Sequence, residues 1–394
     1  MLHVMRTYGR KPVSFSHGKG AWLVDHHGTK YLDALCGIAV TGLGHCHPEV
    51  TKAIQEQAET LIHCSNLYEI PEQATLSEKL CSLSNMEAVF FCNSGAEANE
   101  AAIKLARLHG HNSGIEQPII IVAEQSFHGR TMGTLSATGN RKVQAGFEPL
   151  LGGFARVPFG DVAAVELVAK NNKGIVAILI EPIQGEGGIQ IPDIHYLNKL
   201  RTICDSENWL MMVDEVQTGI GRTGAWFAHQ HNHIEPDVMT LAKGLGNGFP
   251  IGACLARGQA ATVLSPGTHG STFGGNPLAS RAALATLNAI ESNHLIGQAT
   301  LIGDAIVNGL KARLSDCQAV KEYRNKGLMI GIELDRPCAE IVDIALEHRL
   351  LLNVTASSVV RLLPPLVLTE DETEYLVSTL ADVIRKFLKQ STQK

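Results

Sequence analysis

Short runs of almost uniformly apolar residues recur through the middle of the chain and alternate with amphipathic stretches. A strand with one face in water alternates apolar and polar residues, whereas a strand covered on both faces is apolar throughout. The uniform runs therefore predict a mainly parallel α/β sheet with helices between its strands. The strands that we expect span residues 88–92, 118–124, 174–182, 210–215, 238–242 and 252–256.

Helical patterns flank these strands. Residues 49–62 and 71–84 carry apolar positions at helical spacing before the first strand of the sheet. A longer helix is predicted over residues 277–296, after the last strand of the sheet. Asn276 is a suitable cap for it, and Pro277 fits its first turn.

The two ends of the chain have a different pattern. Residues 20–35 predict a hairpin whose turn is centred on His27 and Gly28. From about residue 300 the pattern becomes α+β, with strands at 327–334 and 359–368. We expect the two ends to pack together into one smaller domain. This expectation divides the chain into residues 1–48, 49–299 and 300–394, with the middle part as the large domain.

Composition and charge argue against several classes of partner. The 394 residues are 45% hydrophobic and 18% charged, with a formal net charge of −6. That balance gives no general attraction to nucleic acid or to an anionic membrane. The first residues lack the pattern of a secretory signal, and no apolar stretch approaches the ~20 residues of a membrane span. We therefore expect a cytoplasmic protein that binds neither nucleic acid nor membrane.

The nine cysteines are odd in number and scattered, and no two of them are spaced as C-x-x-C. This distribution favours reduced thiols over a disulfide framework or a zinc site. Histidines are dense at residues 44–48 and 229–233, but neither cluster has the H-E-x-x-H pattern or an adjacent carboxylate. We expect loops and turns there, and no metal site.

Polar residues gather where the predicted strands end, which is where open α/β sheets bind ligands. Asp214 closes one apolar strand, and Lys243 follows another. After the strand at 88–92, Ser94 and Glu97 form a capping box at the start of a helix. Gly95 would let a ligand approach the first free N–H groups of that helix, a favourable place for a phosphate.

Each of these features alone has a structural explanation. Lys243 could extend its ammonium to water, Asp214 could sit in an ion pair, and the capping box could serve only its helix. Together they match the needs of pyridoxal 5'-phosphate, which has a ring nitrogen to be kept protonated, an aldehyde that condenses with an amine, and a phosphate. A buried carboxylate such as Asp214 needs a cationic or hydrogen-bonding partner in either case.

A competing motif lies at residues 219–224, whose sequence GIGRTG matches the dinucleotide fingerprint G-x-G-x-x-G. Its glycines do not directly follow a predicted strand, and the residues after it are a poor start for a helix. This context disfavours a nicotinamide-dependent dehydrogenase, which is the alternative from a different class of enzyme. A catalytically silent binding protein is also disfavoured, because the reactive residues are present.

The chain resembles the class III (subgroup II) pyridoxal-phosphate aminotransferases. The resemblance rests on motifs that occur in the order, and at roughly the spacing, of that family: SGAEANEAAIKLAR, FHGRTMGTLSATG, EPIQGEGG, VDEVQTGIGRTG, TLAKGLGNGFPIGA and GSTFGGNPLA. It covers nearly the whole chain. It also assigns GIGRTG to the motif that contains Asp214.

The resemblance implies a type I pyridoxal-phosphate fold, with a mainly parallel seven-stranded-type sheet in a large domain and a smaller α+β domain built from both termini. It also implies a homodimer whose active sites lie at the subunit interface. Within the family, the chain most resembles the enzymes of arginine biosynthesis that act on N2-acetyl-L-ornithine and 2-oxoglutarate. Activity on succinyldiaminopimelate, ornithine or 4-aminobutyrate is the alternative inside the family.

The resemblance assigns cofactor contacts residue by residue. Lys243 matches the lysine that condenses with the cofactor, and Asp214 matches the partner of the ring nitrogen. Gln217 matches the residue near the phenolic oxygen, and Phe127 the aromatic ring that covers the pyridine.

The phosphate and substrate contacts are assigned in the same way. Gly95 and Ala96 match the backbone cradle of the phosphate, and Thr272 matches a phosphate ligand contributed by the other subunit. Ser271, beside Thr272, is expected near the substrate.

Two arginines, Arg130 and Arg361, correspond to positions that bind substrate carboxylates, a role suited to a planar guanidinium. Glu186 matches a gate residue that pairs with the second arginine when the substrate presents its terminal amine. Structural roles for the arginines stay open, since Arg130 could cap a strand end.

Three positions depart from the pattern of the acetylornithine-specific members. Thr41 stands where asparagine is common, and Gly42 and Gly244 stand where alanine is common. The glycines at 244, 246 and 248 are expected to let the backbone turn tightly beside the cofactor. The departures concern fine specificity and not the type of reaction.

Overall fold

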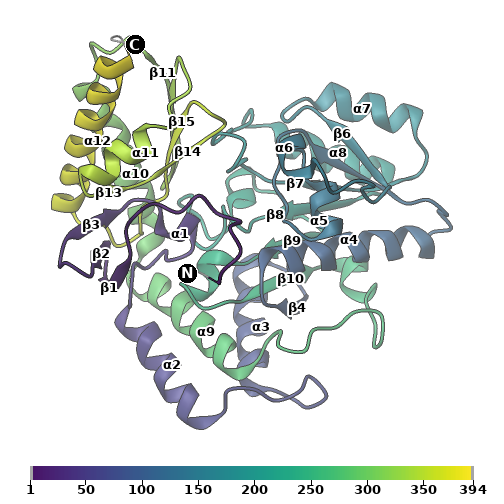
Figure 1. The fold of residues 1–394 in the computed structure, drawn as a ribbon. Coiled ribbons are helices and arrows are strands. Elements are labelled where there is room, and N and C mark those ends of the chain that lie inside the picture. Colours follow the sequence, from purple (N-terminus) through teal and green to yellow (C-terminus); the bar gives the residue numbers. More distant parts are fainter. Residues whose placement is uncertain (1–2, 392–394) are drawn as a thin grey trace.

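A seven-stranded sheet forms the centre of the computed structural model, which describes residues 3–391 (Figure 1). Its spatial order is β4-β10-β9-β8-β7-β5-β6. β10 runs antiparallel to both of its neighbours, and the other neighbouring pairs are parallel. The strands are β4 (Ala88–Cys92), β5 (Ile119–Ala123), β6 (Phe154–Val157), β7 (Ile175–Ile180), β8 (Leu210–Asp214), β9 (Val238–Leu241) and β10 (Gly252–Ala256).

The prediction of a mainly parallel sheet is confirmed, and all six expected strands are present within one or two residues of their predicted ends. β6 was missed. It is a short strand at the edge of the sheet, and Arg156 interrupts its apolar pattern. The guanidinium of Arg156 reaches the carbonyl oxygen of Ser136 instead of disturbing the sheet.

Apolar side chains on both faces of the sheet explain the uniform strand sequences. Along β7, Ile178 and Ile180 belong to the main core, whereas Ala177 and Leu179 belong to a second core on the opposite face. Helix α4 (Gly95–Asn112) covers this second face with Ala102 and Leu105 among others. The remaining helices of this region are α3 (Pro71–Ser84), α5 (Met132–Ala137), α6 (Arg141–Gln144), α7 (Val162–Asn171) and α8 (Tyr196–Glu207).

Helices α2 (Pro48–Thr60) and α9 (Pro277–Ser292) lie below the sheet, whereas α10 (Leu295–Arg313) lies among the elements of the C-terminal part of the chain (Figure 1). The prediction of one helix over 277–296 was wrong at its end. The helix stops at Ser292, and His294 has a φ of +52° before α10 begins. Histidine and asparagine adopt left-handed backbone more readily than most residues, so the Asn293–His294 pair is a natural break. Asn276 caps α9 as expected, accepting from the N–H of Ala279 at 2.9 Å.

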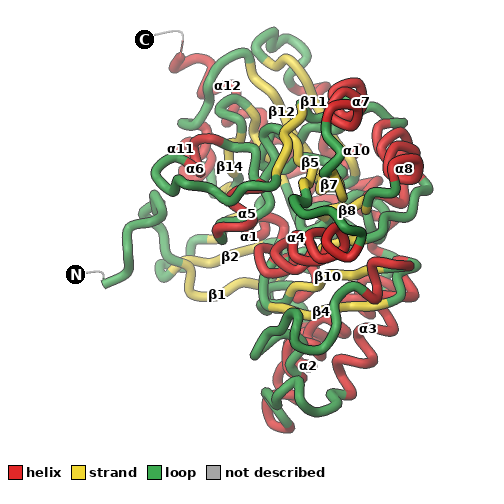
Figure 2. Tube along the Cα trace, turned by 90° about the vertical axis from the view of Figure 1, so that its right-hand side faces the viewer, coloured by secondary structure: helices red, strands yellow, loops and turns green. Residues whose placement is uncertain are grey.

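Two small sheets form the rest of the molecule (Figures 1 and 2). The first has the order β1-β2-β3-β13, and the second has the order β11-β12-β15-β14. The strands are β1 (Phe15–Lys19), β2 (Trp22–Asp25), β3 (Lys30–Asp33), β11 (Val320–Lys326), β12 (Met329–Leu334), β13 (Leu350–Leu351), β14 (Asn353–Thr355) and β15 (Val359–Leu362). The helices beside them are α1 (Cys36–Ala39), α11 (Ile341–Glu347) and α12 (Glu370–Ser391).

The two chain ends meet directly in the first small sheet, where β13 pairs in parallel with β3. The expected hairpin is present, and the Asp25 carboxylate stabilises its turn by accepting the N–H groups of His27 and Thr29, both at 2.8 Å. β15 ends at Leu362 because two prolines follow shortly after it. The division at residues 48 and 299 stays a prediction.

Over residues 3–391, no helix combines the length and the apolar character that crossing a membrane requires. The same residues contain no group of three or more metal-ligating side chains placed to hold an ion. The nine cysteines, all within this range, are unpaired. Helix α12 extends to Ser391, and residues 392–394 lie outside the described part.

Candidate active site

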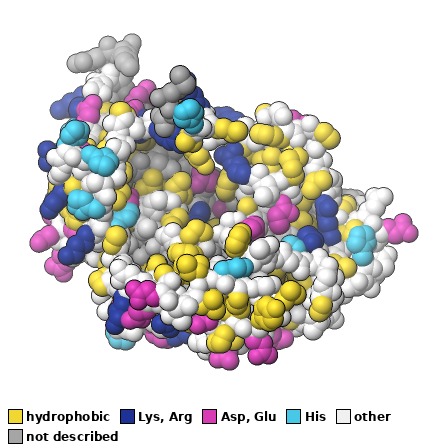
Figure 3. Space-filling view, turned by 60° about the horizontal axis from the view of Figure 1, so that its bottom comes forward, with side chains coloured by type: hydrophobic (Ala, Val, Ile, Leu, Met, Phe, Trp, Pro, Cys, Tyr) yellow, Lys and Arg dark blue, Asp and Glu magenta, His cyan; other side chains and the backbone are white. Residues whose placement is uncertain are grey.

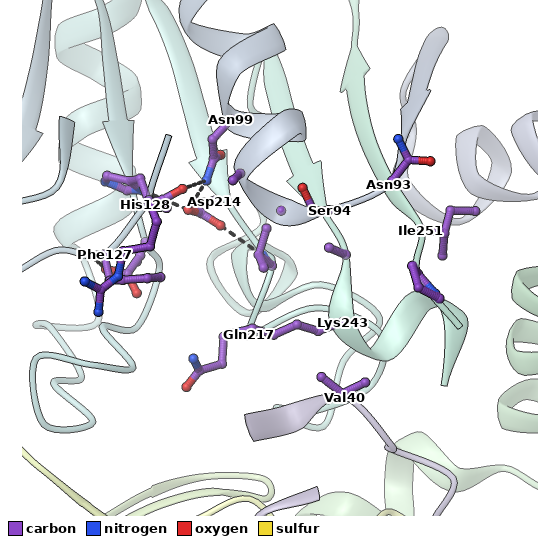
Figure 4. Close-up of a pocket in the computed structure, with 18 of the residues that line it drawn as sticks. Val40, Asn93, Ser94, Asn99, Phe127, His128, Asp214, Gln217, Lys243 and Ile251 are labelled. Carbon is purple, nitrogen blue, oxygen red and sulfur yellow. Dashed lines mark hydrogen bonds and ion pairs between the residues drawn. The ribbon is translucent and has the colours of Figure 1, made fainter. Parts of the chain in front are cut away.

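A cavity of about 430 Å³ opens at the carboxyl ends of β8 and β9, beside the first turn of α4 (Figure 4). Asp214, Gln217, Lys243 and Phe127 all line it, although they come from three separate stretches of the chain. The face seen in Figure 3 is hollowed near its centre, with acidic and basic side chains inside the hollow. The structure therefore brings together the residues that the strand ends singled out.

Asp214 is held by a buried polar network, and its side chain is only 4% exposed. Its Oδ2 accepts from Asn99 Nδ2 at 2.7 Å and from His128 Nδ1 at 2.8 Å, and its Oδ1 accepts from the N–H of Val216 at 3.0 Å. Thr240 in turn donates its hydroxyl to Asn99 Oδ1 at 2.8 Å. The expectation that Asp214 requires hydrogen-bonding partners is confirmed.

Lys243 follows β9 after one intervening residue, Ala242, and opens a single turn of 3₁₀ helix. Burial of its amine lowers the pKa of Lys243, and the positive charge of Arg361 lowers it further, while Glu186, Asp214 and Glu181 act in the opposite direction. A lowered pKa increases the fraction of neutral amine near neutral pH. Neutral amine is the nucleophilic and basic form.

The backbone around Lys243 turns in a different way from the one predicted. Gly248 has the expected left-handed φ of +108°, but Gly244 and Gly246 do not adopt positive φ. The left-handed positions are instead Lys243 itself, at +43°, and Asn247, at +44°. Gly246 is required for space, since a Cβ there would lie 2.9 Å from Ile251 Cγ2. Left-handed backbone at a lysine costs about 1 kcal/mol, so tertiary contacts must hold this turn.

Helix α4 begins at the rim of the cavity with a capping arrangement close to the predicted one. Ser94 Oγ accepts from the N–H of Glu97 at 3.2 Å, while the Glu97 carboxylate accepts from the N–H of Asn93 at 2.8 Å. A Cβ at Gly95 would lie 2.7 Å from Val216 Cγ1. Glycine is therefore the residue that fits there, and Gly95 and Ala96 line the cavity in the first turn of α4, where free backbone N–H groups favour an anion.

Phe127 and Arg130 form one wall of the cavity. The Arg130 guanidinium lies 5.6 Å from the centre of the Phe127 ring, in cation–π geometry. The carboxylate of Glu181 accepts from the N–H groups of Phe127 at 2.9 Å and of Gly185 at 3.2 Å. Burial raises the pKa of Glu181 to about 7; the nearby Asp214 charge raises it too, whereas His128 opposes the shift.

Arg361 is fully buried on β15, in the sheet β11-β12-β15-β14, and contacts Gln217, which lines the cavity. Its Nη1 donates to Glu186 Oε1 at 2.6 Å and to Gln217 Oε1 at 3.2 Å, and its Nε donates to Asn353 Oδ1 at 3.0 Å. Its Nη2 is buried without a partner in the described chain. A carboxylate bound at Nη2 would satisfy the guanidinium.

Ser271 and Thr272 lie outside the cavity, on a separate exposed pocket formed with residues 63–67. Ser271 Oγ accepts from the N–H of Gly274 at 3.0 Å. Of the three positions that depart from the family pattern, Thr41 has a buried hydroxyl with no hydrogen-bond partner among residues 3–391. A Cβ at Gly42 or Gly244 would meet its nearest neighbour at 3.7 or 3.5 Å, so alanine would fit at both positions.

Asn99, His128, Glu181 and Asn353 were missed by the sequence reasoning. Two of them carried a usable signal. His128 directly follows Phe127 in one of the quoted motifs, and Glu181 is a polar residue at the end of an apolar strand, as Asp214 is. Asn99 and Asn353 gave none, because their partners lie far away along the chain.

The GIGRTG loop has a structural role in the folded chain. Its arginine, Arg222, is buried and donates to the carbonyl oxygens of Leu328, at 3.4 Å, and of Pro364. The loop leads into a short 3₁₀ turn over Ala228–Asn232 and not into a helix. This arrangement lacks the helix N-terminus on which a dinucleotide fingerprint depends.

Comparisons with known proteins identify the family of the chain. The family model described as aminotransferase class-III matches residues 4–384. The acetylornithine aminotransferase of Nitrosomonas europaea is 60% identical over 389 residues, which are 99% of each chain. That of Methanothermobacter thermautotrophicus is 46% identical over 97% of this chain and 96% of its own.

Solved structures of aminotransferases also superpose closely on this chain. The N-acetylornithine aminotransferase of Stenotrophomonas maltophilia superposes with a TM-score of 0.86 at 34% identity, over 97% of this chain and 98% of its own. The ornithine aminotransferase of Toxoplasma gondii superposes with a TM-score of 0.94 at 33% identity, over 100% of this chain and 94% of its own. The chain belongs to the class-III aminotransferases, the family of type I fold whose cofactor is pyridoxal 5'-phosphate.

Proposed function

We propose that this chain is an acetylornithine aminotransferase, which transfers the δ-amino group of N2-acetyl-L-ornithine to 2-oxoglutarate. The products are N-acetyl-L-glutamate 5-semialdehyde and L-glutamate, as in arginine biosynthesis. The observation that carries the proposal is the meeting of Lys243, Asp214 and the start of α4 in one cavity. The curated relatives at 46–60% identity support the choice of substrate.

The residues of the cavity fit the cofactor. The first turn of α4 offers N–H groups to a phosphate, Asp214 offers a buried carboxylate to a protonated ring nitrogen, and Phe127 offers a ring face. Gln217 and Lys243 line the same space. When bound, the cofactor supplies an electron-accepting ring that stabilises negative charge on the substrate carbon.

Two residues of this chain carry the proton chemistry in this proposal. Lys243, as neutral amine, removes the proton from the δ-carbon of acetylornithine and would deliver it to the C4' carbon of the cofactor, on the other side of the transferred nitrogen. Asp214 keeps a proton on the ring nitrogen, because Asn99 and His128 fix its carboxylate in a site that excludes water.

Substrate carboxylates are assigned to the two arginines. Arg130, at the exposed wall, binds the α-carboxylate of acetylornithine. Arg361 stays paired with Glu186 while that substrate is bound, and it binds the second carboxylate of 2-oxoglutarate or L-glutamate after the pair opens. One site then serves both half-reactions.

A substrate panel tests the choice of amino donor. The purified protein is supplied with 2-oxoglutarate and with acetylornithine, succinyldiaminopimelate, ornithine or 4-aminobutyrate in turn. We expect the highest kcat/KM for acetylornithine. A higher value for ornithine or 4-aminobutyrate would reassign the substrate, and the transaminase chemistry would stand.

We also propose a cytoplasmic homodimer with shared active sites. Exposed apolar side chains gather on the loop after α2 and beside Thr272, among them Leu61, Ile62, Leu67 and Phe273. Phe273 contacts His63 with their ring centres 5.2 Å apart, so the two loops form one surface. A second copy seated there would cover this surface, and Thr272 would then face the phosphate position of the other subunit.

A further inference from the structure

Residues 184–190 form a closed loop that carries Glu186, and we name them the Glu186 loop. Gln184 and Gln190 exchange two backbone hydrogen bonds of 3.1 Å across its base. Gly188 has a φ of +105°, and a Cβ there would lie 3.0 Å from the Cβ of Ala356. The loop is thus tightly folded and in close contact with the segment between β14 and β15.

Arg324 on β11 anchors this loop by a buried hydrogen bond. Its Nη2 donates to the carbonyl oxygen of Gly188 at 2.8 Å, and its Nη1 is 2.5 Å from the carboxylates of both Glu322 and Glu333. Only 9% of the Arg324 surface is exposed. The two carboxylates orient the guanidinium so that its Nη2 is directed at the loop, while its Nε is buried without a hydrogen-bond partner among the described residues.

Thr355 on β14 provides a second, independent anchor, because its hydroxyl donates to the carbonyl oxygen of Glu186 itself. Apolar contacts also hold the Glu186 loop in place. Ile189 is fully buried with a φ of +51° and clusters with Met329 and Leu363. A Cβ at Gly331 would lie 2.9 Å from Ile189 Cβ, which shows how closely the loop lies against β12.

Arg324, Thr355 and Arg361 all belong to the sheet β11-β12-β15-β14. The anchors therefore connect the loop to the same body that carries its ion-pair partner. On the other side, Gln184 donates to the carbonyl oxygen of Glu124 at 2.8 Å, in the large domain. How easily Glu186 moves away from Arg361 therefore depends on the anchors of the loop as well as on the attraction between the two charges.

We propose that Arg324 and Thr355 are positioning residues that hold the Glu186–Arg361 pair closed and so set the preference between substrates with one and with two carboxylates. The inference rests on the proposed function, because it uses both half-reactions. Loosening either anchor lets Glu186 leave Arg361 more readily. Arg361 is then available to 2-oxoglutarate more of the time, and acetylornithine meets an uncompensated cation beside Lys243.

Arg324→Gln and Thr355→Val in the holoenzyme test the proposal, with Arg336→Gln as the control. Arg336 pairs with Asp335 at the exposed end of the same sheet and is 39% exposed. In each anchor variant, the ratio of kcat/KM for 2-oxoglutarate to kcat/KM for acetylornithine should rise by roughly three- to tenfold, the effect of losing one buried hydrogen bond. Amide hydrogen exchange in residues 184–190 should also increase in the two variants only.

A purely structural role predicts a different pattern. It would lower both kcat/KM values together and leave their ratio unchanged, and this outcome would overturn the proposal. Unchanged exchange in residues 184–190 would overturn it as well. Thr355→Val keeps the test valid if Arg324→Gln does not fold. If the parent enzyme does not use acetylornithine, the proposed function fails, and the ratio is measured with whichever amino donor of the panel it does use.

Discussion

Lys243 combines two unusual properties, a left-handed backbone and an amine whose pKa is lowered by burial and by Arg361. Neither property is expected of a lysine that only extends to water. Lys243→Ala should abolish the covalent adduct with the cofactor, seen as loss of the visible absorption band after dialysis. Turnover should fall by more than about 10³-fold, since both nucleophile and proton carrier are removed.

Lys170→Ala on the exposed end of α7 is the matched control and should keep both the band and the activity. A borohydride-stable adduct that persists in Lys243→Ala would refute the assignment of this lysine.

Glu181 makes stability depend on pH. Its pKa of about 7 in the folded protein lies above the ordinary value of 4.5, so the folded state binds more protons than the unfolded state between these two values. Stability should therefore fall as pH rises from about 5 to 7, by up to about 3 kcal/mol for this group. Glu181→Gln should remove this component.

The measurement is urea unfolding of cofactor-free protein at several pH values. The variant should have a flatter pH profile, and it should be less stable at pH 5 because a glutamine cannot accept from both Phe127 and Gly185. Parallel profiles in the two proteins would contradict the raised pKa.

Among elements, the start of α4 places a strict steric demand on its sequence. Gly95→Ala would push a Cβ to within 2.7 Å of Val216 Cγ1, and Val216 is itself held by its N–H bond to Asp214. We expect the affinity for the cofactor to fall by at least roughly tenfold, the effect of about 1.4 kcal/mol. Gly244→Ala has its nearest contact at 3.5 Å and should bind the cofactor normally. Fluorescence titration of cofactor-free protein compares the two variants.

Strands were the elements that could be predicted best, because burial on both faces leaves an unbroken apolar run. β6 and the break between α9 and α10 could not be predicted in the same way, since Arg156 and His294 take their conformations from tertiary contacts and local backbone. The catalytic candidates were found because strand ends concentrate polar residues. The roles of Asn353 and Arg324 could be recognised only in the folded structure, because the hydrogen bonds that define these roles form only there.

At the scale of the whole molecule, shared active sites can be tested with mixed dimers. Lys243→Ala and Thr272→Ala are each expected to be weakly active alone. If Thr272 serves the other subunit, a mixed dimer contains one site with both defects and one with neither. Reassembly of the two variants should then restore activity toward about one quarter of the parent value in a statistical mixture of dimers. Sedimentation measurements confirm the dimer, and absence of any recovery would place Thr272 in its own subunit's site.

The pairing of β3 with β13 has a consequence for synthesis of the chain. Leu32 on β3 pairs with Leu350 on β13. The outer edge of β3 therefore has no partner strand until almost the whole protein has been translated. At a translation rate of about 5–20 residues per second, that delay is roughly 15–65 s. The seven-stranded sheet is complete at Ala256 and can form on the ribosome during this interval. We therefore expect the domain that holds most of the cavity to fold first, with the edge of β3 exposed until the C-terminal part emerges.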